Sequence, residues 1–431
     1  MSWPTTRLRY VAALNPAVRA DLTAAQDTEV SFLPMEAIGE DGSLNLDRVR
    51  PVAEVRTGYS YFEDGDVAFA KVTPCFENGK GALMRDLQLG AGFGTSELTV
   101  LRPKGNTSAR FLNYVVQSEQ FRQNGAGAMT GAGGLKRVPD DFTRDFKTPW
   151  PKRSEQERIA NFLDEQTARI DALIAEKERL VESLRAFQFS HSSNLMARGL
   201  NASAAFEKPT YPELVELPSH WTVKRLKVLG EVRSGVAKGK DLGERATVLL
   251  PYLRVANVQD GYVDLTEVSE IEVPESEATR YLLRKGDVLM NEGGDNDKLG
   301  RGAVWQGQID PCIHQNHVFA VRLHDTSMAE WVSRFTSTDA ARTYFFLRSK
   351  QSTNLASINQ SNVRELPVPM PPEVERAAIL AELDRSAKAT TELINHAVEH
   401  IARLREYRAS LISAAVTGKL DISTYTGPAP A

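Results

Sequence analysis

The chain has 431 residues, of which 42% are hydrophobic and 25% charged, with a net charge of −4 and a pI near 6.1. This length exceeds what one ordinary core accommodates, so we expect two or three domains. The composition is that of a globular protein without a membrane span, and the acidic balance excludes a uniformly basic, non-specific nucleic-acid coat. Two cysteines cannot form a disulfide framework, which favours the cytoplasm.

The first 150 residues predict a mixed α/β domain. Runs of alternating or apolar residues predict strands at Ser31–Met35, Phe62–Ala70 and Thr99–Leu101. Amphipathic spacing predicts a short helix over Phe111–Phe121. A glycine-rich segment, Gly125–Gly134, then leads into two cations.

A long helix is predicted from Pro151 to about Arg198. Ser154 and Glu157 have the spacing of a capping box, and Gly199 stands where a helix would end. An a/d seam is expected along this helix, widened by Ile174 and Val181. Its a positions are Leu163, Ile170, Lys177, Leu184 and His191, and its d positions are Gln166, Leu173, Leu180 and Phe187.

The same helix occurs a second time, 220 residues later. Glu155, Ile159, Leu163 and Asp164 recur as Glu375, Ile379, Leu383 and Asp384. The α/β half recurs too, because Trp221 repeats Trp3, and Gly286-Asp287-Val288 repeats Gly65-Asp66-Val67. The predicted fold class is therefore α/β (α+β), with two repeated α/β domains and two long helices that pair as an antiparallel coiled coil. The expected ranges are domain 1 at 1–150, helix 1 at 151–200, a linker at 201–219, domain 2 at 220–370, helix 2 at 371–424 and a tail at 425–431.

Motifs for catalysis are sparse. Gly90–Gly94 superficially looks like a nucleotide loop but lacks the βαβ context and the acidic residue, and no Walker or amino-methyltransferase motif occurs. Cys312, His314 and His317 would need a fourth ligand to bind zinc, so a strand is the preferred interpretation. A stand-alone nuclease or methylase is thus disfavoured, and we expect no catalytic, cofactor-binding or metal-binding residues.

Amides and cations among glycines suit DNA contacts, because they match base edges and phosphates. Before any family argument, a solvated hairpin loop or ordinary surface explains these segments equally well. In the first half the candidates are Lys71, Asn78, Lys80, Lys136 and Arg137. In the second half they are Asn291, Asn296, Lys298, Arg301, His314, Gln315, Asn316, Asn359, Gln360, Asn362 and Arg364.

The whole chain resembles the specificity subunit of type I restriction-modification enzymes. The most telling residues are Pro149-Trp150-Pro151, Glu155-Gln156, the run Ile170–Ile174 and the ending Ala414–Ile422. Leu217-Pro218-Ser219-His220-Trp221 is similar to the opening of a target-recognition domain, as Asn291–Trp305 is to a recurrent variety of it. One departure is Glu375-Arg376, where the family has Glu-Gln.

This resemblance implies a non-catalytic reader of double-stranded DNA. Each recognition domain would contact one half of a bipartite site in the major groove, and the helices would set the spacer. Two methyltransferase subunits would dock on it, bringing S-adenosylmethionine and flipping the target adenine, and restriction subunits could add ATP- and Mg-dependent cleavage. The alternative is a coiled-coil scaffold whose duplicated domains bind protein or peptide partners.

Overall fold

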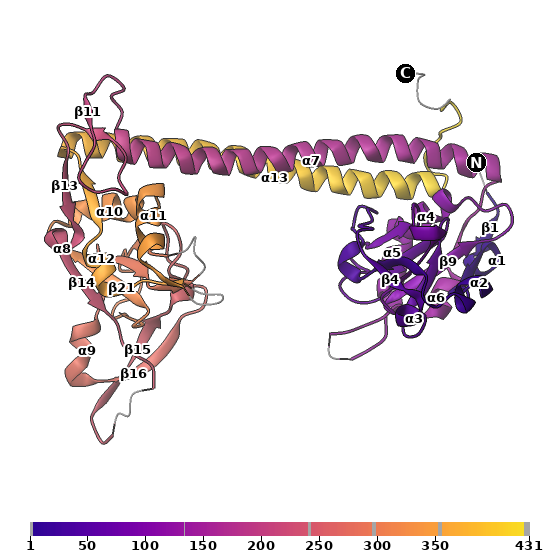
Figure 1. The fold of residues 1–431 in the computed structure, drawn as a ribbon, viewed down its shortest axis with the longest axis horizontal. Helices are drawn as coiled ribbons and strands as arrows, with labels where there is room; N and C mark the ends of the chain where they lie inside the picture. The colour runs from indigo at the N-terminus through magenta and orange to yellow at the C-terminus, as the bar shows by residue number, and fades with distance from the viewer. Residues whose placement is uncertain (1–2, 133, 240–242, 295–298, 352–355, 426–431) are drawn as a thin grey trace. The chain divides into compact units, whose positions relative to one another are not determined.

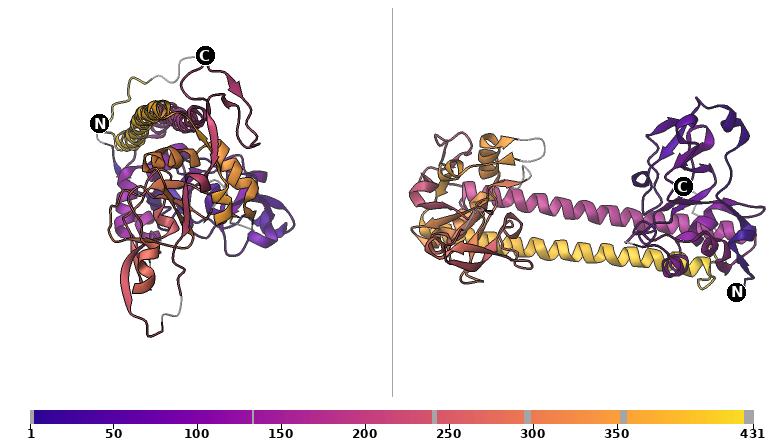
Figure 2. Two further views of the ribbon diagram at one scale, coloured as in Figure 1. Left: turned by 90° about the vertical axis from the view of Figure 1, so that its left-hand side faces the viewer. Right: turned by 90° about the horizontal axis from the view of Figure 1, so that it is seen from below.

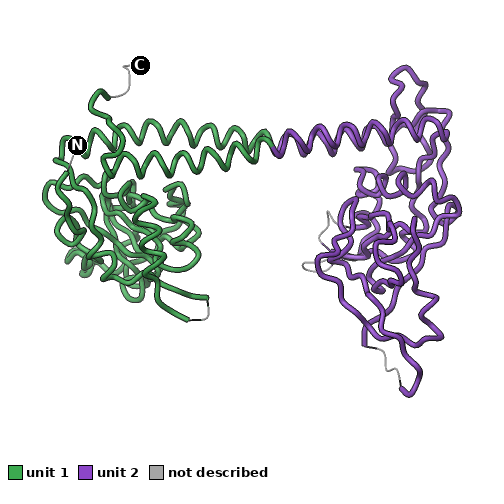
Figure 3. Tube along the Cα trace, turned by 180° about the vertical axis from the view of Figure 1, so that it is seen from behind, with its two compact units in different colours: residues 1–180, 396–431 green, residues 181–395 purple. Residues whose placement is uncertain are grey.

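Two helices of unusual length organise the chain: α7 (Arg153–Arg198) has 46 residues and α13 (Glu373–Val416) has 44. The computed structural model describes residues 3–132, 134–239, 243–294, 299–351 and 356–425. It divides into two units, shown in Figure 3: unit 1 is 1–180 with 396–431, and unit 2 is 181–395. Both divisions fall inside the long helices, so each unit contains part of α7 and part of α13. No helix among the described residues has the length and apolar character needed to cross a membrane.

Unit 1 contains two four-stranded sheets. The antiparallel sheet has the order β2-β9-β6-β7, and the mixed sheet has the order β4-β3-β8-β5, in which β3 and β8 are parallel. A third pair, β1-β10, joins the two ends of the domain. The strands are β1 (Thr5–Arg7), β2 (Ala12–Leu14), β3 (Glu29–Leu33), β4 (Val49–Pro51), β5 (Ser60–Glu63), β6 (Val67–Ala70), β7 (Gly81–Leu83), β8 (Ala91–Gly94), β9 (Leu98–Pro103) and β10 (Lys147–Pro149).

Six short helices complete the α/β part of unit 1. They are α1 (Leu8–Val11), α2 (Ala20–Ala24), α3 (Val52–Val55), α4 (Ala109–Gln117), α5 (Glu119–Ala128) and α6 (Asp140–Asp145). The strands at 31–35 and 99–101 are confirmed within a residue or two. Phe62–Ala70 is two strands joined by a turn at Gly65, and the helix predicted over 111–121 is two helices, because Ser118 caps a new one. Four of the five residues of Gly90–Gly94 form strand β8, so this segment is not a nucleotide loop.

Unit 2 repeats this plan. Its antiparallel sheet is β14-β21-β17-β19, and its mixed sheet is β16-β15-β20, with β15 and β20 parallel; the β13-β24 pair corresponds to β1-β10. The strands are β13 (Thr222–Arg225), β14 (Gly230–Ser234), β15 (Thr247–Leu253), β16 (Ser269–Pro274), β17 (Val288–Asn291), β18 (Gly293–Gly294), β19 (Gly302–Val304), β20 (Ile313–His314), β21 (Val318–Leu323), β22 (Lys350–Gln351), β23 (Ala356–Ser357) and β24 (Pro367–Met370). The helices are α8 (Leu226–Leu229), α9 (Glu275–Tyr281), α10 (Ala329–Thr336), α11 (Asp339–Arg348) and α12 (Gln360–Arg364).

An ion pair between a buried aspartate and a half-buried arginine marks the same position in both units. Asp66 accepts two hydrogen bonds from Arg102 in unit 1, at 2.7 and 2.8 Å, and Asp287 accepts two from Arg322 in unit 2, at 2.6 and 2.9 Å. Both carboxylates also cap a backbone N–H at the preceding turn. The duplication predicted from framework residues is therefore confirmed by equivalent strands and by an equivalent internal contact.

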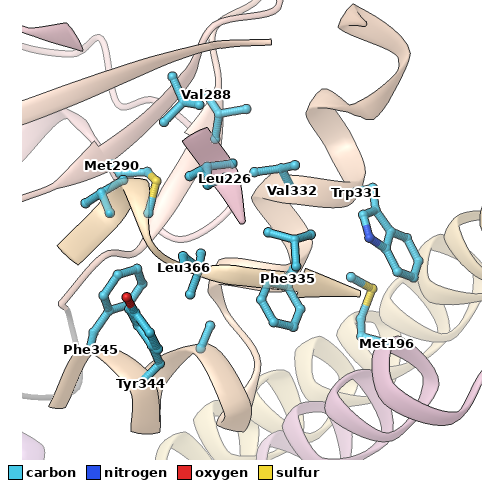
Figure 4. Close-up of a cluster of buried hydrophobic side chains, with 14 of the residues drawn as sticks. Met196, Leu226, Val288, Met290, Trp331, Val332, Phe335, Tyr344, Phe345 and Leu366 are labelled. Atoms are coloured by element: carbon cyan, nitrogen blue, oxygen red, sulfur yellow. The ribbon is translucent and has the colours of Figure 1, made fainter. Parts of the chain in front are cut away.

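The predicted linker at 201–219 is folded onto unit 2. It forms the hairpin β11 (Phe206–Glu207) and β12 (Leu217–Pro218), and Leu214 and Leu217 are buried in the main core of the unit. Figure 4 shows another part of this core, where Met196 of α7 lies beside Trp331 and Phe335 of α10. The α/β part of unit 2 is thus anchored on the end of α7.

The paired helices run antiparallel within each unit (Figures 1 and 2). In unit 1, Arg405 pairs with Glu178 and Arg408 with Asp171, so sequence numbers rise along one helix as they fall along the other. In unit 2, Met196 near the end of α7 shares a core with Ile379 near the start of α13. This arrangement confirms the predicted pairing.

Of the two rows predicted for the helix-pair seam of α7, the row of d positions is wrong. At the a positions Leu163 and Ile170 are buried, and Lys177, Leu184 and His191 are half-buried. At the d positions, however, Leu173, Leu180 and Phe187 are 45, 43 and 57% exposed. Residues four after each a position close the seam instead, and these include Thr167, Ile174 and Val181. Ile174 and Val181, which were expected only to widen the seam, belong to one of its two rows. The apolar row of Leu173, Leu180 and Phe187 faces outward.

The predicted capping box is also wrong. Helix α7 begins at Arg153, so Ser154 lies inside its first turn, and Glu157 pairs with Arg110 and Arg153. The glycine ends are confirmed: Gly199 and Gly418 have φ of +68° and +75°. A Cβ on Gly199 would lie 3.1 Å from the Trp221 ring, and one on Gly418 would lie 3.1 Å from the Trp3 ring. Each helix therefore ends against the tryptophan that opens an α/β domain.

Candidate nucleic-acid interface

In unit 1, three of the predicted cations lie at one edge of the domain. The chain after β6 pairs with the segment after the glycines, through hydrogen bonds from Val138 N to Lys71 O and from Thr73 N to Lys136 O. Lys71 N also donates to Glu97 O, at 2.8 Å. These contacts bring together Lys71, Lys136 and Arg137, which were predicted from distant parts of the sequence.

Arg137 in this group is held by a carboxylate. Its guanidinium donates to both oxygens of Glu97, at 2.9 and 2.7 Å, and this contact holds the pKa of Glu97 below its ordinary value. Both side chains are accessible, so the fork orients Arg137 without burying it. Contact with a phosphate or a base would require Arg137 to exchange this partner.

Two other unit 1 candidates are engaged inside the fold. Lys80 Nζ donates to Met35 O at 3.2 Å, which ties β7 to the 3-10 turn Met35–Ala37. Asn78 donates to Glu40 at 2.9 Å and lines a cavity of about 630 Å³ that Arg405 and Arg408 also line. The Asn78 side chain therefore faces the helix pair of unit 1.

In unit 2, the carboxyl ends of three strands converge. Gln315 N donates to Leu253 O, the last residue of β15, and Glu292 N donates to His317 O just after β17. Gln315 and Asn316 are half-buried here, and Arg301 is the cross-strand neighbour of Asn291. Arg301, Gln315 and Asn316 thus lie around one edge, at the position that corresponds to the edge in unit 1.

Two predicted contacts are buried and leave the candidate interface. His314 is 2% exposed and its Nδ1 lies 2.6 Å from Val318 O; burial lowers its pKa to about 4. Asn291 is fully buried. Burial raises the pKa of the nearby Cys312 thiol to about 12, and His317 pairs with Glu292. Within the described ranges no group of three His, Cys, Asp or Glu side chains could hold a metal ion.

The segment Asn359–Arg364 builds a helix start. Asn359 and Asn362 form a reciprocal capping box at α12, and Gln360 donates to Val232 O. Arg364 is exposed. The side chains of Asn359, Gln360 and Asn362 therefore form hydrogen bonds within the fold. The remaining candidates, Asn296 and Lys298, lie outside the described residues.

Sequence reasoning missed Arg254, which follows β15 and borders the same edge of unit 2. Its side chain is 39% exposed, and the nearest carboxylate, Glu267, is 3.8 Å away. The signal was present in the repeat, because Arg254 replaces Pro34 in two otherwise matching segments, Phe32–Met35 and Tyr252–Val255. This single difference between the two repeated segments singles out Arg254 as a candidate contact.

Comparison with known proteins gives consistent results from sequence and fold. No family model matches the chain. It is 36% identical over 160 residues to the Escherichia coli type I restriction enzyme EcoEI specificity subunit, covering 36% of this chain but only 26% of that subunit. It is 23% identical over 326 residues to the EcoKI specificity subunit of E. coli strain K12, covering 74% of this chain and 68% of that subunit.

Two solved structures share the fold over nearly the whole chain. One, from a study of complex assembly and conformational transition of the type I R-M system, has a TM-score of 0.72 at 17% identity and covers 97% of this chain and 98% of its own. The HsdS subunit of Thermoanaerobacter tengcongensis has a TM-score of 0.51 at 18% identity and covers 97% of each chain. The chain is thus homologous to the specificity subunits of type I restriction enzymes and has their fold.

Proposed function

We propose that this chain is the DNA-reading subunit of a type I restriction-modification complex. Each α/β domain reads one half of a bipartite double-stranded site in the major groove, and the helices set the unread spacer. The chain itself carries out no catalysis. It acts in the cytoplasm, where the complex meets DNA.

One observation carries the proposal: a duplicated framework holds two different sets of side chains at the same edge. The Asp–Arg pair, the antiparallel sheet and the long helices are equivalent in the two units, and the mixed sheets differ only by β5, which has no counterpart in the mixed sheet of unit 2. The edge in unit 1 presents Lys71, Lys136 and Arg137, whereas the edge in unit 2 presents Arg254, Arg301 and Gln315. Repeating a scaffold while changing its edge residues suits a protein that reads two unlike half-sites.

The outward apolar row of α7 supports docking of methyltransferase subunits on the helices. Leu173, Leu180 and Phe187 recur every seven residues on the exposed face, and Leu393 and Tyr407 of α13 occupy the equivalent positions and are 56 and 58% exposed. Exposed apolar groups in a regular row are typical of an interaction surface. S-adenosylmethionine, ATP and Mg²⁺ belong to the partner subunits in this proposal, with restriction subunits as further partners.

The test is to map methylated adenines in cells that contain the partner methyltransferase genes, with and without this chain. The expected result is one bipartite motif that appears only when the chain is present. Exchanging residues 1–150 for the matching domain of a relative should change one half of the motif and preserve the other. Methylation that is independent of the chain would refute the proposal.

A further inference from the structure

The edge of unit 2 holds three polar side-chain atoms that are buried and have no hydrogen-bond partner among the described residues. They are Asn291 Oδ1, Arg301 Nε and Arg254 Nε, out of seven such atoms in the described part of the chain. A buried polar atom without a hydrogen-bond partner destabilises a fold, so three such atoms at one edge require an explanation.

The orientation of Asn291 explains why its own oxygen is left over. Its Nδ2 donates to Val255 O at 3.4 Å, in the 3-10 turn Val255–Asn257, and to Val258 O at 2.9 Å, at the C-cap of that turn. Carbonyl oxygens only accept hydrogen bonds, so the amide nitrogen must face them and Oδ1 must face away. Asn291 therefore clamps the turn that begins directly after Arg254.

Unit 1 performs the same task with a different residue. Lys80 precedes β7 as Arg301 precedes β19, and Lys80 donates to Met35 O, the carbonyl equivalent to Val255 O. The position of Asn291 at the end of its strand is filled in unit 1 by Ala70, which cannot hold the turn. In unit 2, Asn291 makes the hydrogen bonds that hold the turn, so the side chain of Arg301 is not needed for this contact.

From this exchange we infer that Arg254 and Arg301 are specificity-determining contacts to DNA, and that Asn291 is the residue that positions Arg254. The inference rests on the proposed function and adds to it Arg254, whose base contact is a pair of adjacent acceptors such as N7 and O6 of guanine. Burial of Nε fixes the stem of each side chain and leaves the terminal nitrogens of the guanidinium for a bidentate contact. Because Pro34 and Ala70 stand at the equivalent positions of unit 1, only the half-site of unit 2 uses this device.

The experiment measures methylation motifs and rates for variants in the complete methyltransferase complex. Arg254→Ala is expected to lower discrimination at one position of one half-site by roughly 5- to 150-fold. Arg254→Gln replaces the two donors with one donor and one acceptor, which match adenine and not guanine, so a guanine contact predicts the same loss. A phosphate contact predicts weaker binding with the base preference unchanged, and that result would overturn the inference.

Two further variants separate positioning from folding. Asn291→Ala combined with Arg301→Lys restores the side chains of unit 1, so the lysine should hold Val255 O and the unit should stay folded. Compared with Arg301→Lys alone, the double variant should show a further loss of discrimination at the base read by Arg254. Arg284→Ala is the matched control, since Arg284 is exposed and precedes the opposite end of β17. Unchanged discrimination in the double variant relative to Arg301→Lys would contradict the role of Asn291. Absence of chain-dependent methylation with the unaltered protein would instead refute the proposed function.

Discussion

Arg408 of α13 donates to both oxygens of Asp171 of α7, at 2.9 and 3.1 Å, and its guanidinium also lies 3.4 Å from Asp41 O. The equivalent positions in unit 2, 220 residues away, are Gln188 and Thr391. This fork therefore belongs to unit 1 alone, where it joins the helix pair to a loop of the α/β domain.

Arg408→Ala should destabilise the helix pair of unit 1 by about 1–3 kcal/mol, because the Arg408 side chain is only 17% exposed. Hydrogen exchange of amides in the last third of α13 measures this. The control is Arg405→Ala, because Arg405 and its partner Glu178 are 64 and 50% exposed, so a change of at most about 1 kcal/mol is expected. Equal effects of the two variants would contradict a special role for Arg408.

Asp287→Ala should cost unit 2 about 3–5 kcal/mol, because it leaves the half-buried Arg322 without its carboxylate. Asp66→Ala should do the same to unit 1, where Arg102 loses its partner. Denaturant unfolding followed by hydrogen exchange assigns each loss to a unit. If either variant destabilised both units equally, the two pairs would not be the independent supports that the duplication implies.

His314 gives unit 2 an acid-sensitive stability. Its folded pKa of about 4 lies below its ordinary value of 6.5, so the unfolded chain takes up the proton first and acid favours unfolding. The contribution should be fully present above pH 6.5 and should be lost as pH falls toward 4, by about 3 kcal/mol in total. Unfolding of His314→Gln at several pH values should show a shallower acid slope, and an unchanged slope would place the sensitivity elsewhere.

The two apolar rows of α7 should respond differently to charge. Leu173→Glu changes an exposed residue and should leave unfolding unchanged, but it should reduce co-purification with the methyltransferase subunit. Ile170→Glu buries a charge in the core of unit 1 and should prevent that unit from folding. If Leu173→Glu still co-purified fully, docking would not use this row.

Inserting one heptad into each long helix should lengthen the unread spacer. Seven residues add about 10 Å, which corresponds to about three base pairs. Both half-site sequences should persist in the methylation map, with more undefined positions between them. An unchanged spacer would mean that the helices do not set it.

The fold was predictable where the sequence repeats itself, and the site was not. The offset of 220 residues located both long helices and both domains, because framework residues such as Asp66 and Asp287 keep their partners. The seam was assigned incorrectly because α7 carries a second apolar row, and periodicity alone does not say which row is buried. Arg376 stands where the first repeat has Gln156, and this was the departure from the family pattern seen in the sequence. Both side chains are nonetheless buried, and they contact equivalent turns: Gln156 contacts Ser108, and Arg376 contacts Ser327.

The candidate site depended on pairings that sequence does not display. Lys80 and Arg301 looked alike as loop cations, but one holds a carbonyl and the other does not, because a neighbouring strand ends in alanine in one unit and in asparagine in the other. The sequence does not reveal that Arg137 pairs with a carboxylate, because its partner, Glu97, lies forty residues away in the chain. Such partners are set by strand register.

The division of the chain into two units also sets the order in which they can fold during synthesis. Leu411, Ile412, Ala415 and Val416 of α13 lie in the same core as Ile159 and Leu163, so unit 1 needs residues on both sides of unit 2. Between them come the 215 residues Val181–Asn395, which take about 10–40 s to translate. For that time the nascent first domain presents an uncovered apolar helix face on the ribosome, while the second domain can already fold.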